Sequence, residues 1–171
     1  MDTFFEQIVP IRKTGKSLAA ILGIWLLAFV LTAVIFLILI PLLGSIGILL
    51  VFGIFFGAYK LSSFLNIEYE YIITNGTLDV DKITNKSTRK RVLSLELGSV
   101  TRLEKYNPSA VSSANAKTVT FACNGNEPNV YLLVAEKEGK GSSFLVFAPD
   151  ERLQSAIVKF VPKFISNSAF K

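Results

Sequence analysis

The segment Pro10–Ser17, with the sequence PIRKTGKS, ends like a phosphate-binding loop, whose pattern is G-x-x-x-x-G-K-S. Such a loop wraps its backbone N–H groups around a phosphate between a strand and a helix. Here Pro10 replaces the first glycine, no strand pattern precedes the segment, and a long apolar run follows it. We therefore do not interpret this segment as a phosphate site.

The other residue types offer little for catalysis or metal binding. The chain has no histidine, which removes the usual general base near neutral pH and the commonest metal ligand. Asp79 and Asp81 lack the glycine and glutamate of a calcium loop, so we expect a solvated strand face. Cys123 is the only cysteine and is expected to be a buried apolar residue. We predict no catalytic, cofactor-binding or metal-binding residues, although a Ser–Lys nucleophile pair stays open.

The clearest charged feature is basic. The segment from position 82 to 105 contains seven Lys and Arg residues and two Glu residues. Its net charge is therefore +5, which equals the net charge of the whole chain. The candidate contact residues are Lys86, Arg89, Lys90 and Arg91, around a predicted hairpin turn. They suit electrostatic contact with an anionic cytoplasmic leaflet, and equally a solvated segment whose charge only sets topology. Nucleic-acid binding is disfavoured because no aromatic residues are interleaved with the basic ones.

A long uncharged run must position these residues. Residues 17–59 contain no Asp, Glu, Lys, Arg, His, Asn or Gln, and one bilayer span takes about 20 apolar residues. We therefore expect two antiparallel transmembrane helices, at residues 17–40 and 43–61, with Pro41 and Gly44 breaking the run. A cleaved signal peptide fits poorly, because the run is too long and no small-residue cleavage site follows it.

Flanking charges set the expected orientation. Arg12, Lys13 and Lys16 precede the first predicted span, Lys60 ends the second, and the turn between them is uncharged. The positive-inside rule then predicts a two-span protein of the cell membrane with both termini in the cytoplasm.

The second predicted span contains a G-x-x-x-G motif at Gly53 and Gly57, which allows close approach of another helix. We favour packing against the first span, or a chance match, over a dimer face. No ionisable residue lies inside either predicted span, which disfavours a transporter or channel that works through this hairpin alone.

Residues 1–16 are expected to form a cytoplasmic amphipathic lead. Thr3 and Glu6 have the T-x-x-E spacing of a capping box, which predicts a helical turn. That turn would lay its apolar residues on the membrane surface before Pro10 ends it. The alternative is a frayed terminus.

From residue 66 the pattern changes to the alternation typical of half-buried strands. Ile67–Thr74 and Thr77–Thr84 are predicted strands, joined by the strong hairpin signal Asn75-Gly76. Further strands are predicted at residues 91–95, 100–106, 118–123, 130–136 and 144–147. A helix is predicted after Pro149, because apolar residues then recur at helical spacing as far as Phe164, and Pro162 is expected to kink or end this helix. Residues 66–171 are therefore expected to form a small barrel or sandwich with a C-terminal helix.

Short motifs resemble those of bacterial pleckstrin-homology-like (PH-like) domains. Residues 71–74, with the sequence YIIT, and then Leu78 resemble the opening hairpin Y-x-I-T…L of these domains. Residues 92–95 followed by Val100 resemble a later strand, and residues 147–164 resemble the closing strand and helix. The whole chain is similar to an uncharacterised family of small membrane proteins of Gram-positive bacteria. It departs from the PH-like pattern at residues 81–85, where a glycine is usual.

The resemblance implies a seven-stranded half-open β-barrel with a C-terminal α-helix, and it implies no known catalytic residues. The expected fold is thus an α+β membrane protein, a two-helix transmembrane hairpin followed by this PH-like domain. The expected function is a non-enzymatic, membrane-tethered binding or scaffold module, without a cofactor, that contacts anionic lipid head groups or a protein partner. The alternative is an accessory subunit of a larger membrane complex. An enzyme would need a concave site with converging carboxylates and lysines.

Overall fold

The computed structural model describes residues 3–108, 119–125, 127–137, 141–167 and 169–170. The chain divides into two compact units. The helical unit comprises Arg12–Ile67 and Thr84–Ser87, and the globular unit comprises Met1–Ile11, Glu68–Ile83 and Thr88–Lys171.

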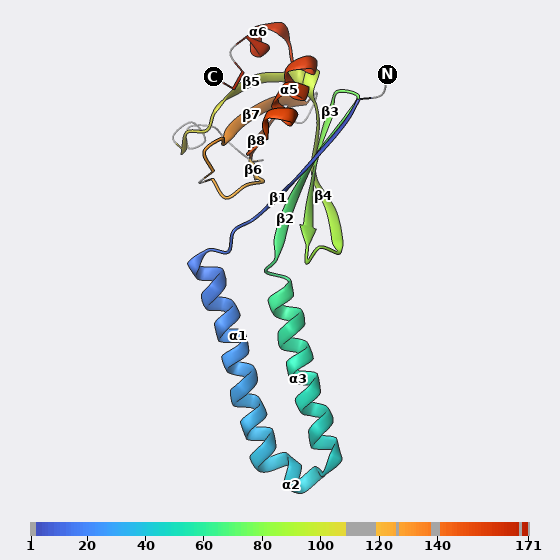
Figure 1. Ribbon diagram of the computed structural model, residues 1–171, viewed down its shortest axis with the longest axis vertical. Coiled ribbons are helices and arrows are strands. Elements are labelled where there is room, and N and C mark those ends of the chain that lie inside the picture. Colours follow the sequence, from blue (N-terminus) through green and yellow to red (C-terminus); the bar gives the residue numbers. More distant parts are fainter. Residues whose placement is uncertain (1–2, 109–118, 126, 138–140, 168, 171) are drawn as a thin grey trace. The chain divides into compact units, whose positions relative to one another are not determined.

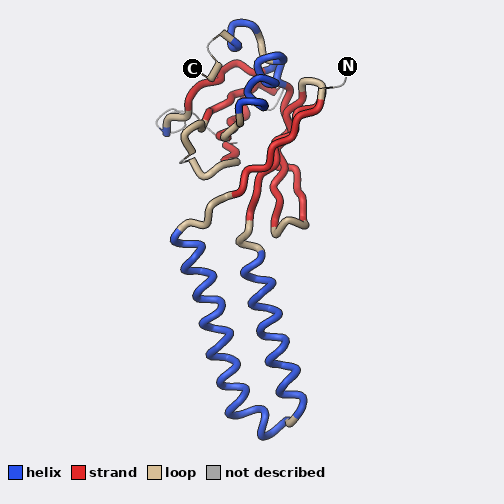
Figure 2. Tube along the Cα trace, viewed as in Figure 1, coloured by secondary structure: helices blue, strands red, loops and turns tan. Residues whose placement is uncertain are grey.

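The helical unit is built around an antiparallel helix hairpin (Figures 1 and 2). Helix α1 (Gly15–Val34) continues through a π-helical segment (Ile35–Leu39) into the short helix α2 (Ile40–Leu43). The chain then reverses at Gly44, whose φ of 56° a glycine adopts without steric cost. Helix α3 (Ser45–Ser63) completes the hairpin.

Aromatic and small side chains pack the two helices together. The Phe55 ring centroid lies 6.2 Å from that of Trp25 and 5.7 Å from that of Phe29. Ala28 on α1 and Ala58 on α3 are buried. These ring pairs and the two buried alanines hold the helices together without polar groups.

Most of the hairpin surface is apolar and exposed. Gly15–Ile38 and Ser45–Ser63 are long and apolar enough to cross a membrane, and only 6% and 11% of their most apolar windows are buried. The two expected apolar helices are therefore present. The expected break at Pro41 is wrong, because Pro41 lies within α2 and the chain reverses only at Gly44.

The first sheet has four strands in the order β1-β2-β3-β4. The strands are β1 (Phe4–Pro10), β2 (Ile67–Thr74), β3 (Thr77–Thr84) and β4 (Thr88–Glu96). Strands β2 and β3 have the predicted bounds. Asn75 and Gly76 between them have φ values of 48° and 88°, as the predicted tight hairpin turn requires.

Strand β1 corrects the expectation for the N-terminal residues. The helical turn predicted from Thr3 and Glu6 is wrong, because Phe4–Pro10 pairs antiparallel with β2, with Pro10 opposite Glu68. Backbone pairing with a strand more than fifty residues away outweighs a local capping signal in these residues. The globular unit therefore begins before the helices, and residues 66–171 alone lack its first strand.

The second sheet has the order β5-β7-β8-β6. Its strands are β5 (Val100–Lys105), β6 (Val119–Phe121), β7 (Tyr131–Lys137) and β8 (Gly141–Phe147). Strand β6 runs parallel to β8, whereas β7 is antiparallel to both of its neighbours. Thr118, which was included in a predicted strand, lies outside the described residues.

One hydrophobic core joins both sheets and helix α5 (Glu151–Phe160). Its completely buried large side chains come from both sheets, the connection that follows β4, and α5: Tyr71, Ile73, Leu78, Leu97, Leu133, Leu145, Phe147, Leu153 and Ile157. A short helix α6 (Lys163–Ser166) follows Pro162. The predicted sheet-rich domain that ends in helix is thus confirmed, although two C-terminal helices stand where one was predicted. Within the described residues no strand pairing closes the two sheets into a barrel.

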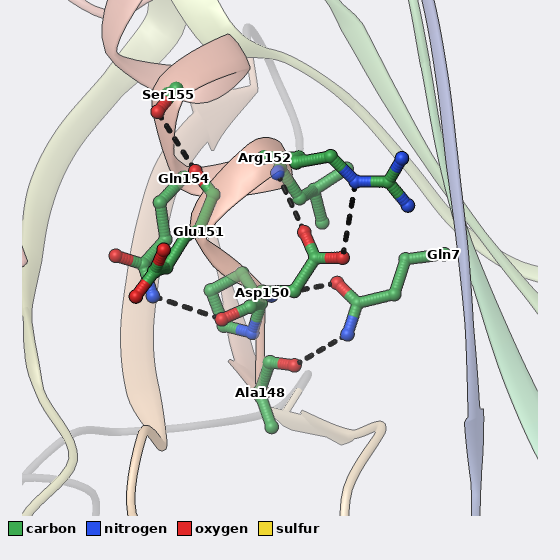
Figure 3. Close-up of polar contacts among 9 residues, drawn as sticks. Gln7, Ala148, Asp150, Glu151, Arg152, Gln154 and Ser155 are labelled. Carbon is green, nitrogen blue, oxygen red and sulfur yellow. Dashed lines mark hydrogen bonds and ion pairs between the residues drawn. The ribbon is translucent and has the colours of Figure 1, made fainter.

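Strand β1 also holds the start of α5 (Figure 3). The Gln7 side chain donates to the Ala148 carbonyl oxygen at 3.1 Å and accepts from the Asp150 N–H at 2.8 Å. Asp150 in turn caps α5, its carboxylate accepting from the Leu153 N–H at 2.7 Å. A residue that precedes both apolar helices in sequence therefore orders the C-terminal helix of the globular unit.

Candidate interaction surfaces

The turn between β3 and β4 carries the first of the candidate basic residues. Asn85 and Lys86 have φ values of 53° and 55°, a left-handed conformation that asparagine tolerates best. The Asn85 N–H donates to the carbonyl oxygen of Asn66 at 2.8 Å. Because Asn66 follows α3 closely in sequence, this hydrogen bond fixes the turn, and Lys86 with it, near the end of α3 within the helical unit.

Arg89 is paired with a buried carboxylate. Its guanidinium lies 3.2 Å from Glu70 Oε1; the Glu70 side chain is 0% exposed and that of Arg89 is 59% exposed. Burial is the main cause that raises the Glu70 pKa, the nearby Glu6 acts in the same direction, and Arg89 opposes them. The arginine thus compensates a buried acid on β2 instead of presenting an uncommitted positive charge.

Arg91 bridges two aspartates on the neighbouring strand. Its guanidinium lies 2.8 Å from Asp79 and 2.9 Å from Asp81. The two carboxylates considered for a cation are therefore occupied by an arginine. This pairing ties β4 to β3 and lowers the net charge of the surface that they share.

Lys86 and Lys90 differ from the two arginines. Both are exposed, and neither forms an ion pair within the part of the chain that the structure describes. The four candidate contact residues therefore divide into a paired set, Arg89 and Arg91, and a solvated set, Lys86 and Lys90. Sequence reasoning missed this division, because it depends on which residues face each other across strands.

The glycine motif of α3 does not contact α1. A Cβ atom added at Gly53 or Gly57 would meet nothing within 4 Å. The contacts between α1 and α3 instead use Phe55 and its ring partners. There is therefore open space beside both glycines, and the motif does not fill the contact between the two helices of the hairpin.

The segment Pro10–Ser17, which resembles a phosphate-binding loop, follows a strand that was not expected from the sequence. A strand does precede it, since Pro10 ends β1. Only residues 11–14 separate that strand from α1, and Thr14 uses its hydroxyl to cap the helix at the Ser17 N–H. The Ser17 N–H is thereby engaged, and Pro10 has no N–H to offer. Backbone groups that a phosphate-binding loop uses are therefore lacking in this segment, which we still do not interpret as a phosphate site.

Cys123 is buried in a second apolar cluster on the other side of β7 and β8. Burial raises the pKa of its thiol to about 11. The thiol is therefore protonated at neutral pH and a poor nucleophile, as expected of a structural cysteine.

A groove of about 490 Å³ opens in the globular unit between the end of β4 and the strands β7 and β8. Its walls carry hydroxyls and carboxylates over a small apolar floor, from Thr77, Ser94, Leu95, Glu96, Ser99, Ala135, Glu136 and Ser143. No sequence motif indicates this groove, because its residues come from segments far apart in the chain. The sequence does show serines and glutamates near the ends of these strands, which is the signal that could have indicated a polar surface there.

The family comparison covers almost the whole chain. The sequence pattern of the family described as "Bacterial PH-like domain (DUF6106)" matches residues 1–167. The chain belongs to this family. No curated protein and no solved structure matches the chain.

Membership confirms the resemblance seen in the sequence. The matched range includes β1 and both apolar helices as well as the later strands. The PH-like domain and the helix hairpin are therefore parts of one family pattern. A PH-like domain suggests a binding or scaffold module, and the surfaces described above are the candidates for that binding.

Proposed function

We propose that this chain is a membrane-tethered, non-enzymatic binding module. The hairpin crosses the cell membrane, and the PH-like domain lies on the cytoplasmic side with both termini. The exposed apolar surface of the hairpin is the observation that carries the proposal, because helices of this length and composition need an apolar environment around them.

The connections between the hairpin and the sheet support a close tether. The chain leaves β1 at Pro10 and re-enters the sheet at Ile67, and these ends belong to two paired strands. The connecting segments are residues 11–14 and 64–66. Even fully extended, the longer one reaches only about 15 Å. Two short connections to neighbouring strands limit how far along the chain the domain can be from the hairpin.

The solvated lysines suit an anionic membrane surface. Each Lys or Arg near such a surface contributes about 1 kcal/mol of attraction. Arg89 and Arg91 are compensated by carboxylates, so we assign the attraction mainly to Lys86 and Lys90. This narrows the set of contact residues predicted from the sequence.

The test uses the full chain in vesicles. Cys123→Ala removes the only native thiol, and Ser87→Cys then carries a fluorophore beside Lys86. Quenching by head-group-labelled lipid reports contact with the membrane. We expect stronger quenching in anionic than in neutral vesicles, and loss of that difference with Lys86→Glu and Lys90→Glu or with added salt.

A matched charge change provides the control. Lys105→Glu with Lys163→Glu alters the net charge equally, on β5 and α6, and should leave the quenching unchanged. Equal quenching of the wild-type chain in neutral and anionic vesicles would contradict a lipid role for these lysines, and a protein partner would remain.

The open surface at Gly53 and Gly57 supports a second candidate function, an accessory subunit of a larger membrane complex. A partner helix approaches closely only where no side chain stands in the way. Under this proposal a membrane protein co-purifies in mild detergent at fixed stoichiometry, and Gly53→Leu with Gly57→Leu releases it. Purification as a clean monomer or homodimer would count against the subunit.

A further inference from the structure

The groove beside β4 points to a second binding surface. We propose that it binds an extended, lysine- or arginine-bearing segment of a partner protein, which pairs with the free edge of β4. The inference builds on the proposed role as a binding module, but it uses none of the four basic contact residues.

The edge of β4 has unpaired backbone groups at the groove. The Leu97 N–H points toward the β3 side, because it donates to the carbonyl oxygen of Gly76 at 2.8 Å. Because backbone direction alternates along a strand, the N–H and C=O groups of Ser94 and Glu96 face the opposite edge. In the residues that the structure describes, β4 pairs with no strand other than β3. Apart from the Glu96 carbonyl, which accepts from the Ser99 hydroxyl at 2.8 Å, this edge is available to an added strand.

The charge of the groove selects a basic segment. Glu96 and Glu136 line it, and none of its lining residues within the described part of the chain is a Lys or Arg. This acidic spot lies in a chain with a net charge of +5. The groove glutamates repel an acidic segment, and covering them without a cation costs free energy of binding. A basic segment instead gains two ion pairs with these glutamates.

The floor of the groove suits the alternation of a strand. Leu95 and Ala135 are 8% and 2% exposed and form an apolar base beneath the hydroxyls. A segment in extended conformation directs every second side chain toward this base and the others toward the carboxylates. Small-molecule sites are predominantly apolar and enclose most of their ligand, whereas this open, hydroxyl-lined groove along a strand edge fits a peptide better.

The test measures binding of a fluorescent, end-blocked peptide of alternating lysine and valine to the full chain in nanodiscs of neutral lipid. A peptide of alternating glutamate and valine is the comparison, and spermidine is the free polyamine competitor. We expect the lysine peptide to bind and the glutamate peptide not to. Glu96→Gln with Glu136→Gln should weaken binding about tenfold, as expected for two exposed ion pairs.

Two further variants separate strand pairing from simple charge. Ser94→Pro removes an N–H on the free edge of β4 that does not pair with β3. The melting temperature of the protein should therefore stay unchanged, while peptide binding falls about tenfold or more. Lys86→Glu with Lys90→Glu should leave peptide binding unchanged, which separates this proposal from lipid contact. The proposal is overturned if the two peptides bind alike, if the groove variants bind as the wild type does, or if spermidine displaces the peptide while Ser94→Pro has no effect.

Discussion

Glu70 is a buried carboxylate whose environment makes the stability of the domain depend on pH. Its only ion pair in the described structure is with Arg89, and the neighbouring carboxyl of Glu6 opposes its ionisation. Desolvation then raises the pKa of Glu70. A raised carboxyl pKa means that the folded domain keeps a proton at a pH where the unfolded chain has released it.

The stability of the domain should therefore fall as the pH rises from the ordinary carboxyl range through the folded pKa of Glu70. Glu70→Gln removes this titration, so we expect the variant to lose less free energy of unfolding than the wild type over that interval. Chemical unfolding at several pH values measures the two slopes, with Glu68→Gln on the same strand as the control. Equal slopes for the wild type and Glu70→Gln would show that Glu70 titrates normally.

Tyr71 is the polar centre of the core. It is 0% exposed, and its hydroxyl donates to the Ala122 carbonyl oxygen at 2.6 Å and accepts from the Ala148 N–H at 3.3 Å. Its ring packs edge-to-face on Phe147 with centroids 5.7 Å apart. One side chain on β2 thus joins the first sheet to the two segments that directly follow the parallel strands β6 and β8.

We expect Tyr71→Phe to lower the free energy of unfolding by about 1–3 kcal/mol, because it leaves a buried carbonyl and a buried N–H without their partner. Denaturant unfolding of the full chain in detergent measures the change. Tyr69→Phe on the same strand is the control, since its hydroxyl forms no hydrogen bond within the residues described. A loss no larger than that of the control would mean that water or neighbouring groups replace the Tyr71 hydroxyl.

Strand β1 belongs to the globular unit, although the two apolar helices separate it in sequence from the other strands. It pairs with β2 along its whole length, and Gln7 holds the turn before α5. Without β1, the edge of β2 would be unpaired, and the core would lose the buried Val9 side chain.

A soluble form of the domain follows from this pairing. Because Pro10 lies opposite Glu68, replacing residues 11–67 with Asn-Gly should join β1 to β2 through a tight hairpin turn. We expect this variant to fold and to melt cooperatively, and residues 66–171 alone to be unfolded or aggregated. Circular dichroism and amide NMR dispersion distinguish the two. A well-folded 66–171 fragment would show that β1 is dispensable.

The elements were predictable where the local pattern agrees with the tertiary contacts. The two apolar helices, β2, β3 and the turn at Asn75-Gly76 were of this kind. Strand β1 was not, since both of its faces mix apolar and polar residues and its partner lies beyond the helices. The pairing of Arg89 with Glu70 and the groove at Ser94 depend on register between distant strands, which a single sequence does not encode locally.

On the scale of the whole molecule, the helix hairpin is an insertion between two paired strands rather than an appended anchor. The family pattern covers both parts together, over residues 1–167. In the proposed function, the membrane restrains the domain through β1 and β2 at once.

Single-cysteine labelling in intact bacterial cells tests the central claim, membrane tethering with a cytoplasmic domain, most directly. In a Cys123→Ala background, Ser45→Cys marks the turn between the helices and Asn167→Cys marks the C-terminal region, and both positions are exposed. With a membrane-impermeant maleimide, we predict labelling of Ser45→Cys in intact cells and of Asn167→Cys only after lysis. Labelling of Asn167→Cys in intact cells, or extraction of the chain from membranes by alkaline carbonate, would contradict the account.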